Sequence, residues 1–159
     1  MKKINQRSYK KALIWIVKIL RKHKIKFNIL GGLAAYAYGS KRMLIDIDIA
    51  MKNENLRKII PDVKDYLIEY PHLSKSKNWI CYFMELRYKG ITIEISGDKG
   101  CKMLNSKTKK WENLGDILSK PLNKRVLGLT LPVIPKKRLI AYKSRLMRKI
   151  DKFDIKNIK

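Results

Sequence analysis

Apolar and polar residues alternate strictly toward the end of the first third of the chain, where Ile45, Ile47 and Ile49 are separated by Asp46 and Asp48. Side chains two residues apart on a strand share a face. The stretch therefore predicts a strand with its isoleucines on one face and both aspartates on the other. The two aspartate Cα atoms would lie about 6.5–7 Å apart, so their carboxylates would be neighbours.

A second alternating stretch, Ile91–Ser96, follows a strand-like segment over Trp79–Tyr88. Lys89-Gly90 between them predicts a two-residue hairpin turn, because glycine supplies positive φ. Glu94 would point away from the isoleucines of its own strand.

Helical spacing marks the first part of the chain. Leu13, Ile16, Val17 and Leu20 form one apolar stripe, which predicts an amphipathic helix covering the sheet. No apolar run reaches the ~18 residues that a membrane span needs, and no cleavage-site pattern follows the stripe. We therefore expect neither a membrane span nor a signal peptide.

The segment after the paired aspartates is expected to form a crossover helix. Asn53 or Asn55 would cap it, and Pro61 would kink or restart it on the way to Ile68. Pro71–Asn78 is rich in polar residues and predicts a loop.

The last third of the chain mixes loop-like and regular segments. Gly97–Lys110 predicts a basic loop, Val126–Ile134 a β-like segment, and Pro135 the first turn of a helix. Together these elements predict one α/β (α+β) domain over residues 1–159, with a small mixed β-sheet flanked by helices.

The composition adds a strong positive charge to this picture. Lys and Arg number 38 against 13 acidic residues, which gives a net charge of +25. This balance favours a polyanionic partner, RNA first, whereas a lysine-rich surface without such a partner is the alternative. Cys81 and Cys101 form no C-x-x-C pair, fit a reducing cytoplasm and offer no zinc site. We therefore expect a cytoplasmic protein.

Because acidic residues are scarce, two of them on one strand face need an explanation. Like charges side by side repel, and a divalent cation is the simplest compensation. Mg²⁺ takes one or two carboxylates together with phosphate oxygens. Two such ions about 3.5–4 Å apart can hold the attacking and leaving oxygens of a displacement. The alternative is an exposed polar face on an edge strand.

The glycines before this strand indicate a phosphate site. Gly31 and Gly32 close an apolar run and open an alanine-rich helix, whose first N–H groups would face a phosphate. Gly39 would end this helix, and Ser40 and Arg42 could then donate to phosphate oxygens.

The order strand, Gly-Gly, helix, Gly-Ser, Arg and then Asp-x-Asp resembles the nucleotidyltransferases of the DNA polymerase β-like superfamily. It looks most like their minimal, antibiotic-modifying and toxin–antitoxin branches. Leu44 stands where many of these relatives carry Thr. The resemblance is most specific over residues 27–51, and it implies a polymerase β-like core with C-terminal helices.

The resemblance also implies a set of metal ligands. Asp46 and Asp48 would bind two Mg²⁺ ions with the help of a third carboxylate on a later strand. Glu94 is our candidate for this third ligand, and it could also accept the proton of the acceptor hydroxyl. Glu85 on the partner strand is the rival.

The C-terminal residues are similar to the ending of such relatives as well. Residues 133–135, Val-Ile-Pro, precede a helix with Lys143, and Arg148 precedes Asp151 and Asp154. By this resemblance Lys143 could reach the triphosphate, with a lysine on the helix surface as the alternative. Arg148 and Asp151, three residues apart on a helix, could simply pair.

The implied reaction is attack of an acceptor hydroxyl on the α-phosphate of a nucleoside triphosphate (NTP), with release of pyrophosphate. Because of the positive charge, we expect RNA, such as a tRNA 3′ end, as the acceptor. The enzyme could also act as part of a toxin–antitoxin system. The alternatives are a partner toxin protein, an antibiotic, or a catalytically inactive basic module that binds nucleic acid. A kinase or hydrolase reading has no support, because there is no P-loop and no Ser-His-Asp arrangement.

Overall fold

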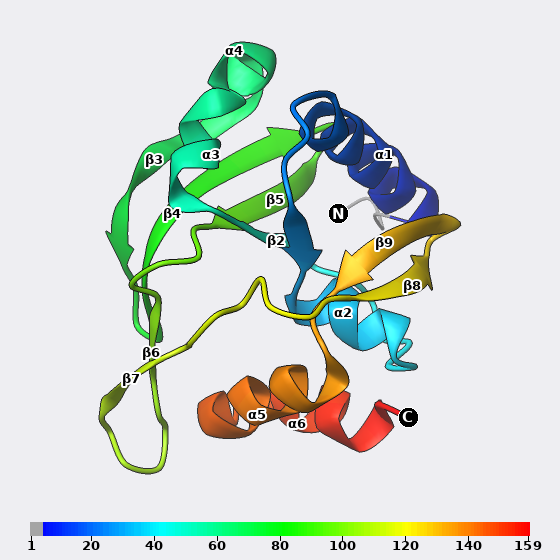
Figure 1. Cartoon of the computed structure of the whole chain (residues 1–159). Coiled ribbons are helices and arrows are strands. Elements are labelled where there is room, and N and C mark those ends of the chain that lie inside the picture. Colours follow the sequence, from blue (N-terminus) through cyan, green and yellow to red (C-terminus); the bar gives the residue numbers. More distant parts are fainter. Residues whose placement is uncertain (1–4) are drawn as a thin grey trace.

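Nine strands form one mixed sheet in the computed structural model, which describes residues 5–159 (Figure 1). The strands are β1 (Phe27–Ile29), β2 (Ile47–Met51), β3 (Leu67–Lys75), β4 (Trp79–Tyr88), β5 (Ile91–Ser96), β6 (Lys102–Leu104), β7 (Trp111–Asn113), β8 (Leu122–Val126) and β9 (Leu129–Val133). The helices are α1 (Gln6–Lys22), α2 (Gly31–Ala37), α3 (Asn53–Lys58), α4 (Ile60–Val63), the 3₁₀ turn η1 (Lys64–Tyr66), α5 (Lys136–Leu146) and α6 (Lys149–Asn157).

The strand order is β7-β6-β4-β5-β2-β1-β9-β8, and β3 pairs with β4 outside this path. This mixed sheet with flanking helices confirms the α/β class expected from the sequence. The extent of a single domain over residues 1–159 stays a prediction, and its first four residues lie outside the described part of the chain.

The centre of the sheet brings the two alternating stretches together. β2 is antiparallel to β1 and parallel to β5, and the register pairs Asp48 with Glu94. β4 and β5 form the predicted hairpin with the predicted bounds, and its turn residues Lys89 and Gly90 have φ angles of 47° and 82°. The prediction of this hairpin is confirmed. It could be made from the sequence because its signals lie in the turn and in the two strands themselves.

The core forms where α1 covers the sheet. The predicted stripe of α1 is buried, and so are Ile47 and Ile49 of β2 and Ile93 of β5. α1 packs against β5, whereas α5 and α6 pack against each other and against α2 (Figure 1). The apolar sides of the two alternating strands therefore lie inside the molecule, as expected.

Ile45 departs from the predicted alternation. β2 begins only at Ile47, and Ile45 is 62% exposed in the loop before it. Leu44 takes the buried position instead, and its carbonyl oxygen accepts a hydrogen bond of 2.7 Å from the Tyr9 hydroxyl of α1. This contact fixes the loop that carries Asp46.

The crossover helix is shorter than expected and is capped differently. Lys52 is the N-cap of α3, and no side chain caps the helix. The Asn53 side-chain oxygen instead accepts the N–H of Lys99 at 3.2 Å. The helix is interrupted before Pro61, as predicted, but the helical segments end at Tyr66 and do not reach Ile68.

The prediction of a loop over Pro71–Asn78 is wrong, because strand β3 includes its residues up to Lys75. β3 pairs only with β4 and so lies at an edge, where a proline such as Pro71 is tolerated. Its register shifts on both sides of Glu69. These irregularities remove the alternating pattern by which the sequence would have revealed a strand.

Two later segments also contain more strand than expected. The predicted loop over residues 97–110 includes β6, which pairs with β4 and forms a hairpin with β7. The β-like segment over residues 126–134 belongs to the β8–β9 hairpin, and β9 lies parallel to β1. Pro135 is the N-cap of α5 and not a residue of its first turn. Strands of three residues are too short to show a pattern.

A disulfide joins Cys81 of β4 to Cys101, which precedes β6, and the two Cα atoms are 4.4 Å apart. The sequence analysis did not predict this pairing, and the reducing cytoplasm expected there stays a prediction. The sequence separation of 20 residues gave no signal of it.

Within residues 5–159, none of the helices combines the length and the apolar character that crossing a membrane requires.

Candidate active site

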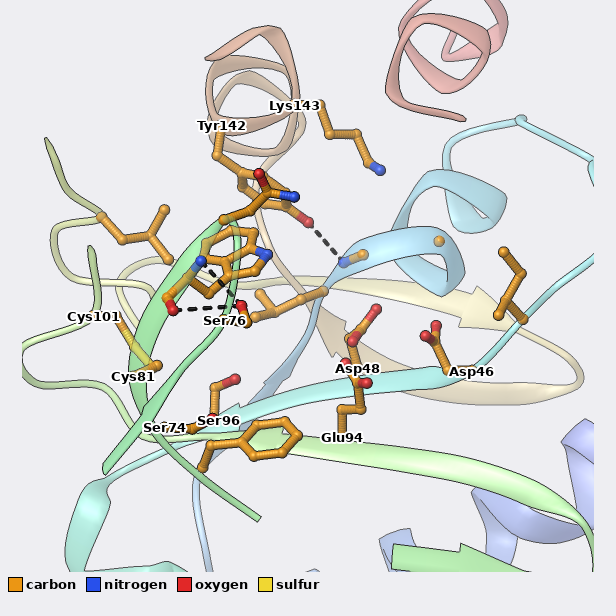
Figure 2. A pocket seen from close by; sticks show the side chains of 18 of the residues that line it. Asp46, Asp48, Ser74, Ser76, Cys81, Glu94, Ser96, Cys101, Tyr142 and Lys143 are labelled. Carbon is orange, nitrogen blue, oxygen red and sulfur yellow. Dashed lines mark hydrogen bonds between the residues drawn. A yellow bond between two sulfur atoms is a disulfide. The ribbon is translucent and has the colours of Figure 1, made fainter. Parts of the chain in front are cut away.

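Three carboxylates meet at the edge of the central strands. Asp46 ends the loop before β2, Asp48 lies on β2, and Glu94 lies on β5 (Figure 2). One carboxylate oxygen from each lies within 4.8 Å of the others. The parallel pairing of β2 with β5 creates this arrangement, because it sets Asp48 directly beside Glu94. We call these residues the acidic triad.

Burial and mutual repulsion raise the pKa values of the acidic triad. Burial, and then the charge of Asp48, raise the pKa of Asp46 to about 7. Burial, and then the charge of Glu94, raise the pKa of Asp48 to about 7 as well. The pKa of Glu94 is raised by burial and by the charge of Asp46. Oxygen ligands that repel one another in this way suit a hard divalent cation such as Mg²⁺.

The strand register continues this line of carboxylates beyond the triad. Glu85 of β4 pairs with Glu94, and Glu69 of β3 pairs with Glu85. Cross-strand partners share a face, so Asp48, Glu94, Glu85 and Glu69 form a carboxylate row with steps of about 4.8 Å between strands. Among the described residues, the group close enough to share an ion contains Glu94 and not Glu85.

The acidic triad lines a cleft of about 600 Å³. Figure 2 shows Asp46, Asp48 and Glu94 on one wall and Tyr142 and Lys143 of α5 facing them. Further along, the cleft is lined by residues that the sequence did not single out for the site: Ser74, Ser76, Trp79, Phe83 and Ser96. The cleft therefore joins the triad to a part that is lined by aromatic and serine side chains.

Gly31 lies directly against the triad. Its φ is +59°, and a Cβ there would collide with Oδ2 of Asp48. Its N–H donates a hydrogen bond of 2.8 Å to the hydroxyl of Tyr142. Burial raises the pKa of Tyr142, so this hydroxyl stays protonated. The Gly31 N–H, which we expected to face a phosphate, therefore already has a partner, and Tyr142 is a residue that the sequence analysis missed.

Ser40 and Arg42 both turn toward α6. The Ser40 hydroxyl is fully buried and donates to Oδ1 of Asp154 at 2.7 Å. Arg42 Nε and Nη2 donate to the two carboxylate oxygens of Asp154 at 2.7 and 2.9 Å. Arg42 still lines the cleft next to Gly32, whereas Ser40 does not line it. The structure thus brings Arg42 to the triad and leaves Ser40 behind it.

Lys143 is 2% exposed, so the alternative of a lysine on the helix surface is wrong. Its Nζ lies 3.1 Å from Oδ1 of Asp151 and 2.9 Å from Oδ2 of Asp154, and the residue also lines the cleft. Arg148 Nε pairs with Asp151 at 2.7 Å, which confirms the expected i, i+3 pair. Although burial opposes it, hydrogen bonds from Arg148 to Asp151 and from Arg42 to Asp154 lower the pKa of each aspartate.

The raised pKa values predict how stability depends on pH without metal. The pKa of Asp46 and Asp48 rises from 3.8 to about 7 on folding, so the folded protein binds these protons more tightly. The free energy of unfolding should therefore fall as pH rises from about 4 to 7, and Mg²⁺ should restore it above that range. Urea unfolding at about pH 5 and pH 8, with and without Mg²⁺, measures this. Asp151 and Asp154, whose pKa values are lowered, lose their contribution only below about pH 4.

The variant with both Asp46→Asn and Asp48→Asn is the control for this experiment. It lacks two of the three carboxylates whose pKa values are raised, so its stability should fall much less over the same pH range, with burial of Glu94 as the remaining cause, and should not respond to Mg²⁺. A wild-type protein whose stability rises between about pH 5 and pH 8 without metal would contradict the expectation.

By sequence, the chain matches no protein-family model and no curated protein. Its fold matches solved structures. A presumed nucleotidyltransferase of Thermotoga maritima, TM1012, aligns with a TM-score of 0.73 and 21% identity over 91% of this chain and 88% of that chain. The lincosamide antibiotic adenylyltransferase LnuA, solved with lincomycin bound, aligns with a TM-score of 0.61 and 19% identity over 92% of this chain and 94% of that chain. The antibiotic-resistance factor ANT(2'')-Ia aligns with a TM-score of 0.61 and 11% identity over 96% of this chain and 82% of that chain. The chain therefore has a nucleotidyltransferase-like fold, as the sequence resemblance implied.

Proposed function

We propose that this chain, which has the nucleotidyltransferase fold, transfers a nucleoside monophosphate from an NTP to an acceptor hydroxyl. The observation that carries the proposal is the acidic triad, whose carboxylate oxygens lie within 4.8 Å of one another in the wall of a cleft. Two Mg²⁺ ions held by Asp46, Asp48 and Glu94 would neutralise phosphate charge and hold the attacking and leaving oxygens.

Different residues of the cleft would have different roles in this reaction. The acceptor oxygen bonds to the α-phosphorus, the bond to the bridging oxygen breaks, and pyrophosphate leaves. Glu94 is in the triad and its pKa is raised, so it is suited to take the proton of the acceptor hydroxyl. Arg42 and Lys143 line the cleft and would contact the phosphates, next to the backbone of Gly32. We assign no phosphate contact to Ser40, which is occupied by Asp154.

Two classes of acceptor are supported by different observations. The net charge of +25 supports RNA, such as a tRNA 3′ end, which is held by many phosphate contacts. The cleft supports a small molecule with hydroxyl groups, because it is walled by Trp79 and Phe83 and lined by serines. Two of the similar structures are an antibiotic adenylyltransferase and an antibiotic-resistance factor, which also favours a small acceptor.

Transfer of label distinguishes these acceptors. The protein is incubated with Mg²⁺, each NTP labelled at its α-phosphate, and one acceptor at a time: total RNA, a lysate protein fraction, or a panel of aminoglycosides and lincosamides. We expect label on one class, with stoichiometric pyrophosphate, and no label when Mg²⁺ is chelated. Label on protein would favour a partner toxin. RNA binding without transfer to any acceptor would contradict the proposed activity and favour a basic binding module.

A further inference from the structure

The β6–β7 hairpin and its approach carry a concentration of positive charge. Residues 99–111 contain five lysines and no acidic residue. The connection between β3 and β4 lies beside this hairpin, because the N–H of Leu104 donates a hydrogen bond of 2.9 Å to the carbonyl oxygen of Asn78. This connection adds two more lysines. We call the following exposed residues the lysine patch: Lys75, Lys77, Lys99, Lys102, Lys107, Lys109 and Lys110.

No acidic side chain neutralises the lysine patch. In the described part of the chain, none of the ion pairs involves any of its lysines. The two acids that flank the hairpin in the sequence already have partners. Glu112 pairs with Arg145 at 3.4 Å, and Asp98 accepts the N–H of Asn53 at 3.1 Å. Because like charges gathered on one surface repel, a polyanion that binds there relieves the repulsion.

The hairpin is held in shape by hydrogen bonds at its turn. The side-chain oxygen of Asn105 accepts the N–H groups of Lys107 and Thr108, at 2.9 and 3.2 Å. The N–H of Ser106 donates to the carbonyl oxygen of Arg145, in the last turn of α5, at 2.9 Å. Figure 1 shows the hairpin projecting from the molecule beside α5. The lysines of the hairpin are therefore carried by an ordered support.

An aromatic ring lies within the lysine patch. Trp111 of β7 is partly exposed, and Lys75 Nζ lies 5.9 Å from the centre of its ring. Bases of single-stranded nucleic acid stack on such rings while lysines bind the phosphates. An acidic protein would need apolar anchors for a stable interface, but none of the large exposed hydrophobic residues lies within residues 74–121. The patch therefore suits a nucleic-acid strand better than an acidic protein.

We propose that the lysine patch and Trp111 bind single-stranded RNA along the rim of the cleft. Lys77 is exposed and also lines the cleft, so a strand bound to the patch passes beside it. Asn78 lines the cleft as well, and its amide can donate to or accept from a ribose 2′-OH, which DNA lacks. Binding needs no catalysis, and only the role of this RNA as the acceptor rests on the proposed function.

The carboxylate row determines which part of a bound RNA suits the cleft. Glu85 and Glu69 line the cleft and repel phosphodiesters, whereas the lysine patch at the rim attracts them. The backbone of a bound strand therefore stays outside. The 3′ side of its last nucleoside carries hydroxyl groups and no phosphate, so it is the part of the strand that is suited to enter.

The experiment measures binding of a fluorescently labelled single-stranded RNA of about 12 nucleotides to the full chain, by anisotropy, without NTP and at several salt concentrations. The test variant replaces four lysines of the hairpin by Gln: Lys102, Lys107, Lys109 and Lys110. We expect affinity at physiological salt to fall at least about tenfold, and the slope of log K against log salt to decrease by about 2–3. All four side chains are exposed, so the urea midpoint should stay close to that of the wild type.

The matched control removes the same charge from another exposed surface, on and just after α1. It replaces four other lysines by Gln: Lys10, Lys11, Lys18 and Lys26. We expect RNA affinity to fall less than about threefold, because only the overall charge of the molecule changes. Equal losses in the two variants would mean that binding follows net charge alone, which would overturn the lysine patch as the binding surface.

Trp111→Leu tests the stacking contact. Leu keeps an apolar side chain in β7 but removes the ring, so affinity should fall about fivefold or more with an unchanged salt slope. Wild-type protein should bind this RNA more tightly than single-stranded DNA of the same sequence, and polyglutamate of equal charge should displace it poorly. Equal affinity for the DNA would overturn the choice of RNA. Equally good displacement by polyglutamate would favour an acidic protein and overturn the proposal.

The outcomes separate this surface from the proposed activity. If RNA binds through the lysine patch but label is transferred to no acceptor, the surface stands and the activity is wrong. If nucleotide is transferred but the hairpin variant binds RNA as the wild type does, the activity stands and the surface is wrong. If the wild type binds no RNA at physiological salt, the surface is overturned whatever the transfer assay gives.

Discussion

Replacing Asp48 by Asn should lower nucleotide transfer by about 10³-fold or more. Asp48 is the central member of the acidic triad, because it pairs with Glu94 across the strands and raises the pKa of Asp46. Asn keeps the shape but removes the charge that would hold a metal ion. Losing about 4 kcal/mol of transition-state stabilisation corresponds to roughly 10³ in rate. The measurement is kcat for transfer of α-labelled nucleotide in Mg²⁺.

The stability of the same variant shows whether the loss is chemical. Removing one of the mutually repelling carboxylates should leave the urea midpoint at about pH 8 equal to or above that of the wild type. Asp65→Asn removes an exposed aspartate of η1 outside the cleft and should change neither quantity. Transfer within about tenfold of the wild type in folded Asp48→Asn would remove the triad from the reaction.

Replacing Gly31 by Ala should reduce activity about 100-fold while costing only about 1 kcal/mol of stability. The backbone at Gly31 has a φ of +59°, which strains any residue with a Cβ. The new Cβ would also collide with Oδ2 of Asp48. The carboxyl carbon of Asp48 would also lie only 2.7 Å from the new Cβ, so the side chain must rotate, and its carboxylate then leaves the metal position. Kinetics and urea unfolding are measured on the same preparation.

Gly90→Ala separates the two effects of this substitution. Gly90 has a φ of +82° in the β4–β5 turn, but a Cβ there would meet no atom within 4 Å. It should therefore lose a similar free energy of unfolding, about 1 kcal/mol, and keep full activity. Equal losses of activity in both variants would mean that backbone strain, and not the displacement of Asp48, is responsible.

The parts of the fold that the sequence predicted well are those with local signals. The β4–β5 hairpin follows from two strand patterns and a Lys89-Gly90 turn within 18 residues. α1 follows from its apolar stripe. The neighbourhood of Asp46, Asp48 and Glu94 could be anticipated because the alternation fixes which face each side chain takes. That Glu94 rather than Glu85 approaches the aspartates depends on the register between β2 and β5, which no local pattern encodes.

The remainder of the site depends on contacts between distant parts of the chain. Arg42 and Asp154 are 112 residues apart, and Gly31 and Tyr142 are 111 apart. The sequence indicated donors after the glycine pair but not that Ser40 would be used up by a buried carboxylate. It presented Lys143 as one of many lysines, although packing against α6 makes it one of the six buried polar or charged residues among the described ones. Edge strand β3 could not be predicted from the sequence, because its irregular pairing with β4 leaves no alternating pattern of apolar and polar residues.

Glu85 and Glu69 follow Glu94 in the carboxylate row and also line the cleft, so they place negative charge beyond the triad. An ammonium group entering there would be attracted by both glutamates, whereas a phosphodiester at the same depth would be repelled by both. The excess of lysine on the exterior can draw polyanions to the molecule, but it does not decide what enters. The donor nucleotide would bind beside the triad, where Arg42 and Lys143 line the cleft, whereas the part lined by Glu85 and Glu69 favours a positively charged group on the acceptor.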